Sequence, residues 1–591
     1  MKKFSNRLYQ SYTQAFQRRL SSVDALPQLA LLGLLSGLVT GAVIILFRSA
    51  IEWPLRWLLP EGNPEGFEQL NIWVRSVLPL AGACALGLLL YRLPRNDHKT
   101  GIAYVIERLN SHQGYISWRS AVLQFITGVI TIGTGQSTGR EGPAVHLGSA
   151  FSSLLGRGMG LPHNSIRTLV ACGTAAAISA SFNTPIAGVI FAMEVVMMEY
   201  TITGFTPVIL ASVTGAIVTQ ATYGTAPAFE VPALVMKSLW EVPYMVFGAM
   251  IIGVMSACFV RLLIWFHRFS EHPIWLRLAA AGLVMVPFAA LLPAVLGIGY
   301  DTVNATFMGE IGLVALIIIA VAKLIVTATT TGLGMPNGLV APIFFIGATL
   351  GGAMGVLGEM VFPEYASSTG FYAMLGMGAM MGAVCQAPLA ALMALLELTH
   401  NPNIVLPGML MITTATIMSH ELFGQRSVFL SILRSQGLDL RSSPITMALQ
   451  RVGVGAILER NFRRIPQNLP LARARRVLKD EPRWLVIDGS DGPVAVMPTV
   501  DLARYVEEHA EALEKADEHE EEPLINLLAI PAQRRDVATV PFQATLQEAL
   551  DRFNETDAEA LLVQRTAAPM IQQVVGVILK PDIENYYQYR R

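Results

Sequence analysis

Long apolar stretches constrain this chain more than any other feature of its sequence. Residues 26–46, 77–90 and 313–325 are almost wholly apolar, and stretches of this kind need lipid or a protein interior. Charged residues make up 14% of the 591 positions, against roughly 25% in an average soluble protein. Beyond Arg434 the composition becomes that of a soluble protein. We therefore predict a membrane domain over residues 26–435, followed by a water-soluble tail.

Charged residues predict the orientation of the chain. The N-terminal segment 1–25 is basic, and it is too polar, with its apolar region too late, for a cleaved secretory signal. The next connection is acidic and the following one is basic: Glu52, Glu61, Glu65 and Glu68, then Arg92, Arg95, Lys99 and Arg108. Because basic residues favour the cytoplasmic side, we predict a multi-pass membrane protein with its N-terminus in the cytoplasm.

No residue pattern indicates an enzyme. The membrane half shows no nucleophile–base set, and the cysteines stand in apolar segments without CxxC spacing or a nearby His cluster. We expect no catalytic residue, no metal site, no cofactor and no nucleic-acid partner. The cysteines are Cys84, Cys172, Cys258 and Cys385.

The membrane half contains an internal repeat. Residues 173–194 align without a gap to residues 376–397, at a constant offset of 203 (388 − 185). Upstream, the offset is 199 (338 − 139), and the matching positions are Gly133, Gly135, Gly139, Pro143, Gly148 and Gly156 with Gly332, Gly334, Gly338, Pro342, Gly347 and Gly355. Chance matching of common Gly and Ala is the alternative, but two ungapped blocks in the same order favour a duplication. Halves separated by an odd number of crossings are inverted, which brings matching segments together at mid-membrane.

Both upstream copies read as a loop that leads into a helix. Glycine permits unusual backbone angles and close approach, while Pro143 and Pro342 suit the first turn of a helix. A helix N-terminus presents unpaired N–H groups and partial positive charge, so two facing termini form an anion site. Partial charges suit a small monovalent anion that must leave again, whereas phosphate needs more fixed positive charge.

Arg140 and Glu141 stand alone between apolar neighbours in the first loop. An ionisable residue within the membrane is a functional hypothesis by default, and a structural Arg–Glu pair is the alternative. A carboxylate at an anion site competes with the anion when ionised and withdraws when protonated. We therefore predict that Glu141 is a pH-sensitive gate.

The residues Gly139-Arg-Glu-Gly-Pro143 resemble the GREGP signature of the CLC chloride channel and transporter family. Residues 338–342 resemble its GxFxP segment, residues 182–188 resemble its next helix junction, and the order agrees across 26–435. The resemblance implies an all-α polytopic membrane fold of tilted, broken helices in two inverted repeats, about 26–225 and 240–435. It also implies a homodimer in lipid with one chloride pore in each subunit, and Glu141 as the external gating glutamate.

The resemblance further implies a set of chloride-binding positions, and this chain departs from the family at some of them. The family's serine corresponds to Thr100, the usual Phe beside Leu339 is Val340, and the tyrosine position is Phe429, which has no hydroxyl to donate. Thr100 as a helix N-cap and Phe429 as packing remain the alternatives. The full set is Thr100, Gly139, Arg140, Gly142, Leu339, Val340 and Phe429.

Proton coupling is the second departure. Exchangers of the family carry an internal glutamate directly after the residue matching Glu194, and this chain has Val195 there. Valine cannot carry a proton, which favours a channel unless water or Glu199 serves instead. Glu194 and its repeat partner Glu397 are alternatively structural carboxylates at helix ends.

The tail resembles a pair of CBS modules, which we place at residues 446–507 and 523–591, joined by an acidic linker at 508–522. A solvated linker is the simple interpretation of that acidic stretch. Such modules often bind adenine nucleotides through a Thr or Ser three residues before an Asp. Here Pro498 precedes Asp501 and Leu579 precedes Asp582, so we doubt nucleotide binding and expect a role in dimer support.

The leading hypothesis is therefore chloride transport gated by protonation of Glu141 and channel-like. Chloride/proton exchange by another proton route is one alternative, and secondary transport of another small anion is a second. A membrane sensor, whose tail acts while its membrane half conducts nothing, is a third.

Overall fold

The computed structural model describes residues 26–200, 202–225, 229, 235–438, 444–490, 492–509, 524–568 and 571–589. The basic segment 1–25 and most of the acidic linker 508–522 lie outside these residues. The chain divides into two compact units, a helical one within residues 26–441 and a smaller α/β one that consists mainly of the residues after 441. This is the predicted fold class: a polytopic helical membrane domain followed by a small α/β region.

Within the described residues, nine helices are long and apolar enough to cross a membrane. The helices of the first half are α2 (Leu26–Leu58), α3 (Ile72–Tyr91), α4 (Gly101–Ser111), α5 (Trp118–Gly133), α6 (Glu141–Gly158), α7 (His163–Phe182), α8 (Pro185–Phe191) and α9 (Ile202–Tyr223). Those of the second half are α10 (Val242–His267), α11 (Ile274–Leu291), α12 (Tyr300–Phe307), α13 (Leu313–Gly332), α14 (Val340–Val361), α15 (Thr369–Cys385), α16 (Pro388–Thr399), α17 (Val405–Ile417) and α18 (Val428–Ser435).

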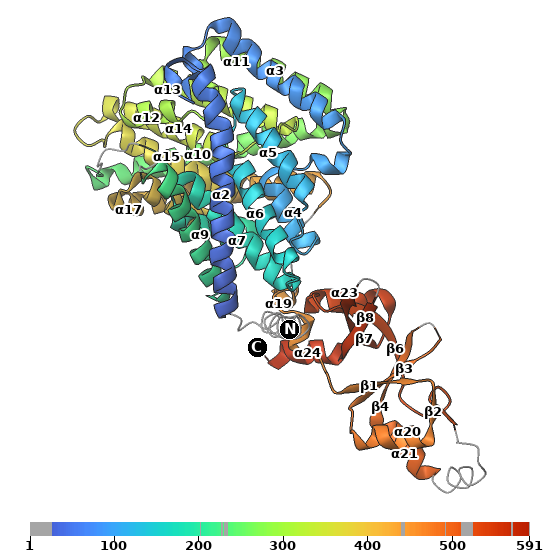
Figure 1. Cartoon of the computed structure of the whole chain (residues 1–591). Helices are drawn as coiled ribbons and strands as arrows, with labels where there is room; N and C mark the ends of the chain where they lie inside the picture. The colour runs from blue at the N-terminus through green and yellow to red at the C-terminus, as the bar shows by residue number, and fades with distance from the viewer. Residues whose placement is uncertain are drawn as a thin grey trace. The chain divides into compact units, whose positions relative to one another are not determined.

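Small residues allow these helices to pack closely. The long helix α2 runs beside α9 and α6 (Figure 1). Glycines at every fourth position of α2 face α9, and a Cβ at Gly33 or Gly37 would collide with the carbonyl oxygen of Pro207 or Ala211. Close backbone approach of this kind is the usual basis of helix association in lipid, where burial of apolar surface gives no driving force between helices.

The two halves repeat the same contacts. A Cβ at Gly148 would collide with the carbonyl oxygen of Gly173, and one at Gly347 would collide with that of Gly376. These two pairs are related by the offsets of 199 and 203 found in the sequence. The equivalent residues Gly139 and Gly338 also pair with each other in antiparallel fashion. A segment that pairs antiparallel with its own copy lies on a local two-fold axis, as the inverted repeat requires.

Two glutamates cap helices of the opposite half. The Glu397 carboxylate accepts hydrogen bonds from the N–H groups of Ile186 (2.9 Å) and Ala187 (2.7 Å) at the start of α8. Its repeat partner Glu194 accepts hydrogen bonds from the N–H groups of Leu389 (3.3 Å) and Ala390 (2.6 Å) at the start of α16. Each carboxylate satisfies helix N–H groups that have no partner within their own helix. These contacts agree with the structural interpretation of both residues.

The α/β unit contains two successive β-β-α-β-β-α modules. The first comprises β1 (Phe462–Pro466), β2 (Asn468–Pro470), α20 (Leu471–Lys479), β3 (Trp484–Asp488), β4 (Pro493–Pro498) and α21 (Thr499–Glu508). The second comprises β5 (Leu524–Asn526), β6 (Arg535–Pro541), α23 (Leu546–Thr556), β7 (Ala560–Ala568), β8 (Ile571–Leu579) and α24 (Lys580–Tyr589), with α19 (Pro444–Gln450) ahead of both. Six of the strands form one sheet in the order β1-β3-β4-β6-β7-β8.

Each module core includes residues from a segment that the predicted boundaries at residues 446 and 523 assign to the other module. Leu449 and Val452 pack in the core of the second module, whereas Ile525 and Leu527 pack in that of the first, where β5 pairs with β2. The segment before each module thus completes the core of the other one. Sequence order alone suggested two contiguous modules because it does not show which core a flanking segment joins.

Candidate anion pathway

The two glycine-rich loops meet at the centre of the helical unit. The Gly139 N–H donates to the Gly338 carbonyl (2.8 Å), and the Gly338 N–H donates to the Thr138 hydroxyl (3.0 Å). Directly after these residues, α6 begins at Glu141 and α14 begins at Val340. The loops therefore lead into helix N-termini, as the Gly and Pro pattern predicts, and they bring both termini to one place.

Glu141 lies at this meeting point. Its side chain is fully buried, and Oε2 accepts a hydrogen bond from the Ala341 N–H at the start of α14 (3.3 Å). Its other oxygen, Oε1, is buried and has no hydrogen-bond partner among the described residues. A carboxylate that occupies an N–H group of the facing helix blocks that group for any other anion. A buried carboxylate with only one of its oxygens hydrogen-bonded is costly to keep ionised. Such a group is suited to release the Ala341 N–H when it is protonated.

The Arg140 side chain turns away from this point. Its guanidinium donates to the Ser181 carbonyl (2.7 Å), lies 4.0 Å from the Glu52 carboxylate and sits 5.6 Å from the centre of the Tyr300 ring. Its ion-pair partner is thus Glu52 rather than the neighbouring Glu141. Of the predicted chloride-binding residues, Arg140 is the one whose side chain is already held by other groups.

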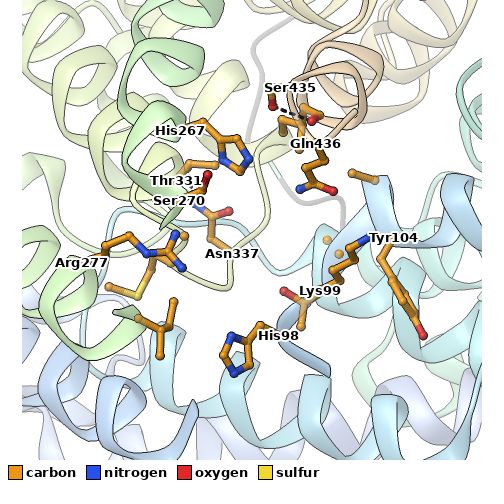
Figure 2. A pocket seen from close by; sticks show the side chains of 18 of the residues that line it. His98, Lys99, Tyr104, His267, Ser270, Arg277, Thr331, Asn337, Ser435 and Gln436 are labelled. Carbon is orange, nitrogen blue, oxygen red and sulfur yellow. Dashed lines mark hydrogen bonds between the residues drawn. The ribbon is translucent and has the colours of Figure 1, made fainter. Parts of the chain in front are cut away.

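A cavity of about 510 Å³ borders this meeting point, since Gly142 and Leu339 line it, and Figure 2 shows its surroundings. Four predicted chloride-binding residues line it, and they come from four different segments: Thr100, Gly142, Leu339 and Phe429. Gly139, Arg140 and Val340 are not part of its lining. The structure therefore brings four of the predicted chloride-binding residues together at one cavity and leaves the remaining three in or beside the loops.

The loop that carries Thr100 is held by hydrogen bonds to two residues that the sequence did not indicate. Thr100 is the N-cap of α4, but its hydroxyl makes no capping hydrogen bond. The Gly101 N–H donates instead to Gln124 Oε1 (2.8 Å) and His146 Nδ1 (3.2 Å), and the His146 ring stacks on Tyr104. Gln124 and His146 belong to no motif themselves, although His146 lies three residues after Pro143, so only the tertiary contacts reveal their role.

Phe429 is 3% exposed in α18, where it belongs to the main apolar core and also borders the cavity. The packing interpretation and the pathway interpretation therefore both describe it. With no hydroxyl on its ring, Phe429 offers an anion only its weakly polar edge.

Basic side chains surround the cavity. Figure 2 shows Lys99, His98, His267 and Arg277 around it. Glu107 is the one acidic residue of the lining, and its carboxylate pairs with the Lys99 ammonium (2.8 Å). The Arg277 guanidinium gives this lining a fixed positive charge, which raises the local concentration of anions. The sequence indicated Lys99 only as one of several basic residues, and it gave no reason to select Arg277 or the histidines.

Val195 lies in a π-helical turn, residues Ala192–Met197, that continues α8. It is 5% exposed and packs in the apolar core. Val195 is thus a buried apolar contact in this chain.

The chain was compared with known proteins. The family model for voltage-gated chloride channels matches residues 81–420. A ClcB-like protein of Ralstonia nicotianae is 30% identical over 436 residues, covering 70% of this chain and 99% of that protein. The H(+)/Cl(-) exchange transporter ClcA of Salmonella typhimurium is 29% identical, covering 69% and 89%. A solved eukaryotic CLC transporter has the same fold, with a TM-score of 0.58 at 18% identity, over 95% of this chain and 99% of that one. The chain belongs to the CLC family of voltage-gated chloride channels and transporters.

Proposed function

We propose that this protein conducts chloride through a pathway gated by protonation of Glu141. Transport of chloride across a membrane is the activity of its family; the gate is the part specific to this proposal. One observation carries it: the Glu141 carboxylate accepts a hydrogen bond from the Ala341 N–H in the first turn of α14. The cavity borders the same helix end, because Leu339 is part of its lining. Protonation weakens that bond, because a neutral carboxyl is a poorer acceptor, and frees the N–H group for an anion.

The cavity supports Thr100, Leu339 and Phe429 as the chloride-binding residues next to this gate, with the amide of Gly142. The Thr100 hydroxyl and the amides of Gly142 and Leu339 are donors, while the Phe429 side chain offers none. We infer that chloride is held more weakly here than in relatives with a tyrosine.

Replacing Phe429 by tyrosine tests this inference. A phenol hydroxyl that donates to chloride adds a charge-assisted hydrogen bond, which strengthens binding about tenfold. The measurement is calorimetric titration of chloride into the purified protein. Phe362→Tyr is the matched control, because Phe362 is 55% exposed and lies away from the cavity. Equal affinities of Phe429→Tyr and the unchanged protein would show that residue 429 only packs.

We infer a channel-like mechanism, since Val195 cannot transfer a proton. The alternative is chloride/proton exchange, which the similarity to an H(+)/Cl(-) exchange transporter favours. An exchanger built on this chain needs another proton route, through water in the cavity or through a carboxylate such as Glu199.

The reversal potential under combined chloride and pH gradients separates the two mechanisms. In proteoliposomes with a fixed chloride gradient, we expect a reversal potential that follows chloride alone when external pH is changed. A reversal potential that moves toward the proton equilibrium potential instead identifies an exchanger. Absence of chloride flux in either condition would remove chloride transport itself.

We infer further that the protein is a homodimer in a bacterial plasma membrane with cytoplasmic termini. The alternation of acidic and basic connections after α2 and α3 supports this orientation. In the tail, Asp501 accepts the Gln533 N–H (2.8 Å) and Asp582 accepts the Leu579 N–H (2.9 Å). Each carboxylate accepts one backbone N–H, and Pro498 and Leu579 stand where a nucleotide-binding pair has Thr or Ser, which weighs against adenine-nucleotide sensing.

A further inference from the structure

The carboxylate of Glu65 occupies the N-terminus of α12. Glu65 lies in the connection between α2 and α3, and its Oε2 accepts a hydrogen bond from the Tyr300 N–H (3.1 Å). Tyr300 is the first residue of α12, and Gly299 before it has a φ of +85°, which only glycine adopts readily. The partial positive charge of a helix N-terminus favours an anion there, and this chain supplies one of its own.

This helix end is the repeat-related copy of the one at the cavity. At the offset of 199, Thr100 and Gly101 at the start of α4 correspond to Gly299 and Tyr300. The supporting residues correspond as well: Gln124 holds the Gly101 N–H, and its mate Lys323 donates to the carbonyls of Val295 and Gly297 (2.9 Å each). The first copy opens onto the anion cavity, whereas the second is filled by Glu65.

Glu65 also faces the arginine that precedes the gate. Glu65, Glu52 and Arg140 line one small cavity of about 50 Å³. The Arg140 guanidinium is 4.0 Å from Glu52, and its Nε is buried with no hydrogen-bond partner among the described residues. The Arg140 guanidinium is thus within electrostatic range of both carboxylates and of its neighbour Glu141. The charge of Glu65 therefore bears on how strongly Arg140 stabilises an ionised Glu141.

Glu65 changes its charge near neutral pH. Burial raises the pKa of Glu65 to about 7, with a further rise from the Asp301 carboxylate, while Arg140 and the N–H groups of Tyr300 and Asp301 oppose this. Burial, with Asp301, also raises the pKa of Glu68. The charged and titratable groups of the surrounding elements are Arg48 and Glu52 of α2, Glu68, Arg140, Tyr300 and Asp301 of α12, and Lys323 of α13. Glu65 is thus roughly nine-tenths protonated at pH 6 and nine-tenths ionised at pH 8.

We propose that Glu65 is a positioning residue for the gate: its ionised carboxylate neutralises Arg140 and thereby weakens the hold of Arg140 on ionised Glu141. This rests on Glu141 being the gate. With residue 65 neutral, Arg140 stabilises the ionised, closed form of Glu141, so that opening needs more acid. Glu65 thus keeps the gate responsive at alkaline external pH, the range in which Glu141 alone would close it more firmly.

The test is the chloride flux of Glu65→Gln proteoliposomes as a function of external pH. We expect its curve to match that of the unchanged protein below about pH 6, where residue 65 is neutral in both. Above about pH 7 we expect the flux of Glu65→Gln to be about threefold lower than that of the unchanged protein. This is the effect of shifting the midpoint of a single-proton gate by about half a pH unit. A purely structural role of Glu65 predicts a uniform loss at every pH.

Two further variants give the matched controls. Glu68→Gln neutralises a neighbouring carboxylate that faces Asp301, Thr302, Lys323 and Arg75 instead of Arg140, and its curve should follow the unchanged protein. Glu52→Gln removes the other carboxylate beside Arg140 and lowers the flux at alkaline pH in the same way, so it serves if Glu65→Gln does not fold. Unchanged alkaline flux in both Glu65→Gln and Glu52→Gln overturns the proposal, as does an equal effect of Glu68→Gln.

The Glu141→Gln background separates this proposal from the gate on which it rests. We expect no difference between Glu141→Gln and the double variant Glu65→Gln/Glu141→Gln, because Glu65 acts through the gate. A threefold difference that persists there refutes the action through Glu141. If the single variant Glu141→Gln retains the steep pH dependence, the proposal that Glu141 is the gate is refuted. That comparison needs no Glu65 variant.

Discussion

Glu141→Gln is expected to retain chloride flux and to lose its steep dependence on external pH. Glutamine has nearly the shape of a protonated glutamate and cannot ionise, so it does not compete with chloride for the Ala341 N–H that Oε2 now occupies. A single-proton gate changes its open fraction by up to about tenfold for each pH unit above its pKa. We expect the variant to vary by less than about twofold between pH 5.5 and 8, measured as initial chloride efflux from proteoliposomes.

Glu397→Gln is the control for this result. It also removes a carboxylate within the membrane, but one that caps α8 through the N–H groups of Ile186 and Ala187 and stands outside the lining of the cavity. It should keep the pH dependence of the unchanged protein. A Glu141→Gln variant that still closes steeply at alkaline pH would show that another group is the gate.

Gly338→Ala is expected to reduce flux at least about tenfold. A Cβ at Gly338 would collide with the Gly139 carbonyl oxygen and would lie 2.9 Å from the Gly142 nitrogen. These are backbone atoms of the facing loop, so neither can rotate away, and the two helix N-termini must separate. Overpacking of this kind costs about 1–3 kcal/mol of stability, and it displaces the N–H groups on which an anion depends. The measurements are flux per reconstituted protein and thermal unfolding in detergent.

Gly158→Ala is the matched control, since it adds the same methyl group at the end of α6, where nothing lies within 4 Å of the new Cβ. It should transport as the unchanged protein does. Normal flux in a stable Gly338→Ala variant would mean that the paired loops do not form the pathway.

The sequence alone predicts the pieces of this site well, because each piece is local. Apolar length indicates a membrane helix, Gly and Pro at fixed spacing indicate a loop before a helix, and an isolated carboxylate between them indicates a function. The helices that begin at Glu141 and Val340 follow from these rules. The repeat adds that the pieces occur twice, and the match of family pattern and order identifies the family.

Contacts between distant segments could not be predicted from the sequence. Nothing local places Glu65 on the N–H of Tyr300, turns Arg140 toward Glu52, or brings Arg277 to the cavity of Thr100 and Phe429. The flanking segments that complete the two tail cores are a similar case, because apolar residues fit either core equally well by composition.

The sequence by itself thus determined the membrane domain, the duplicated halves, the two loop-to-helix junctions and Glu141 as the residue of interest. Only the tertiary structure decided which N–H group Glu141 holds, which residues share its cavity, and that the second copy of the helix end is filled by Glu65. The physical reason is range: helix starts and apolar segments depend on neighbours within a few residues. Hydrogen bonds and charge interactions depend on distances of a few ångström between groups far apart along the chain, such as Glu65 and Tyr300, which lie 235 positions apart.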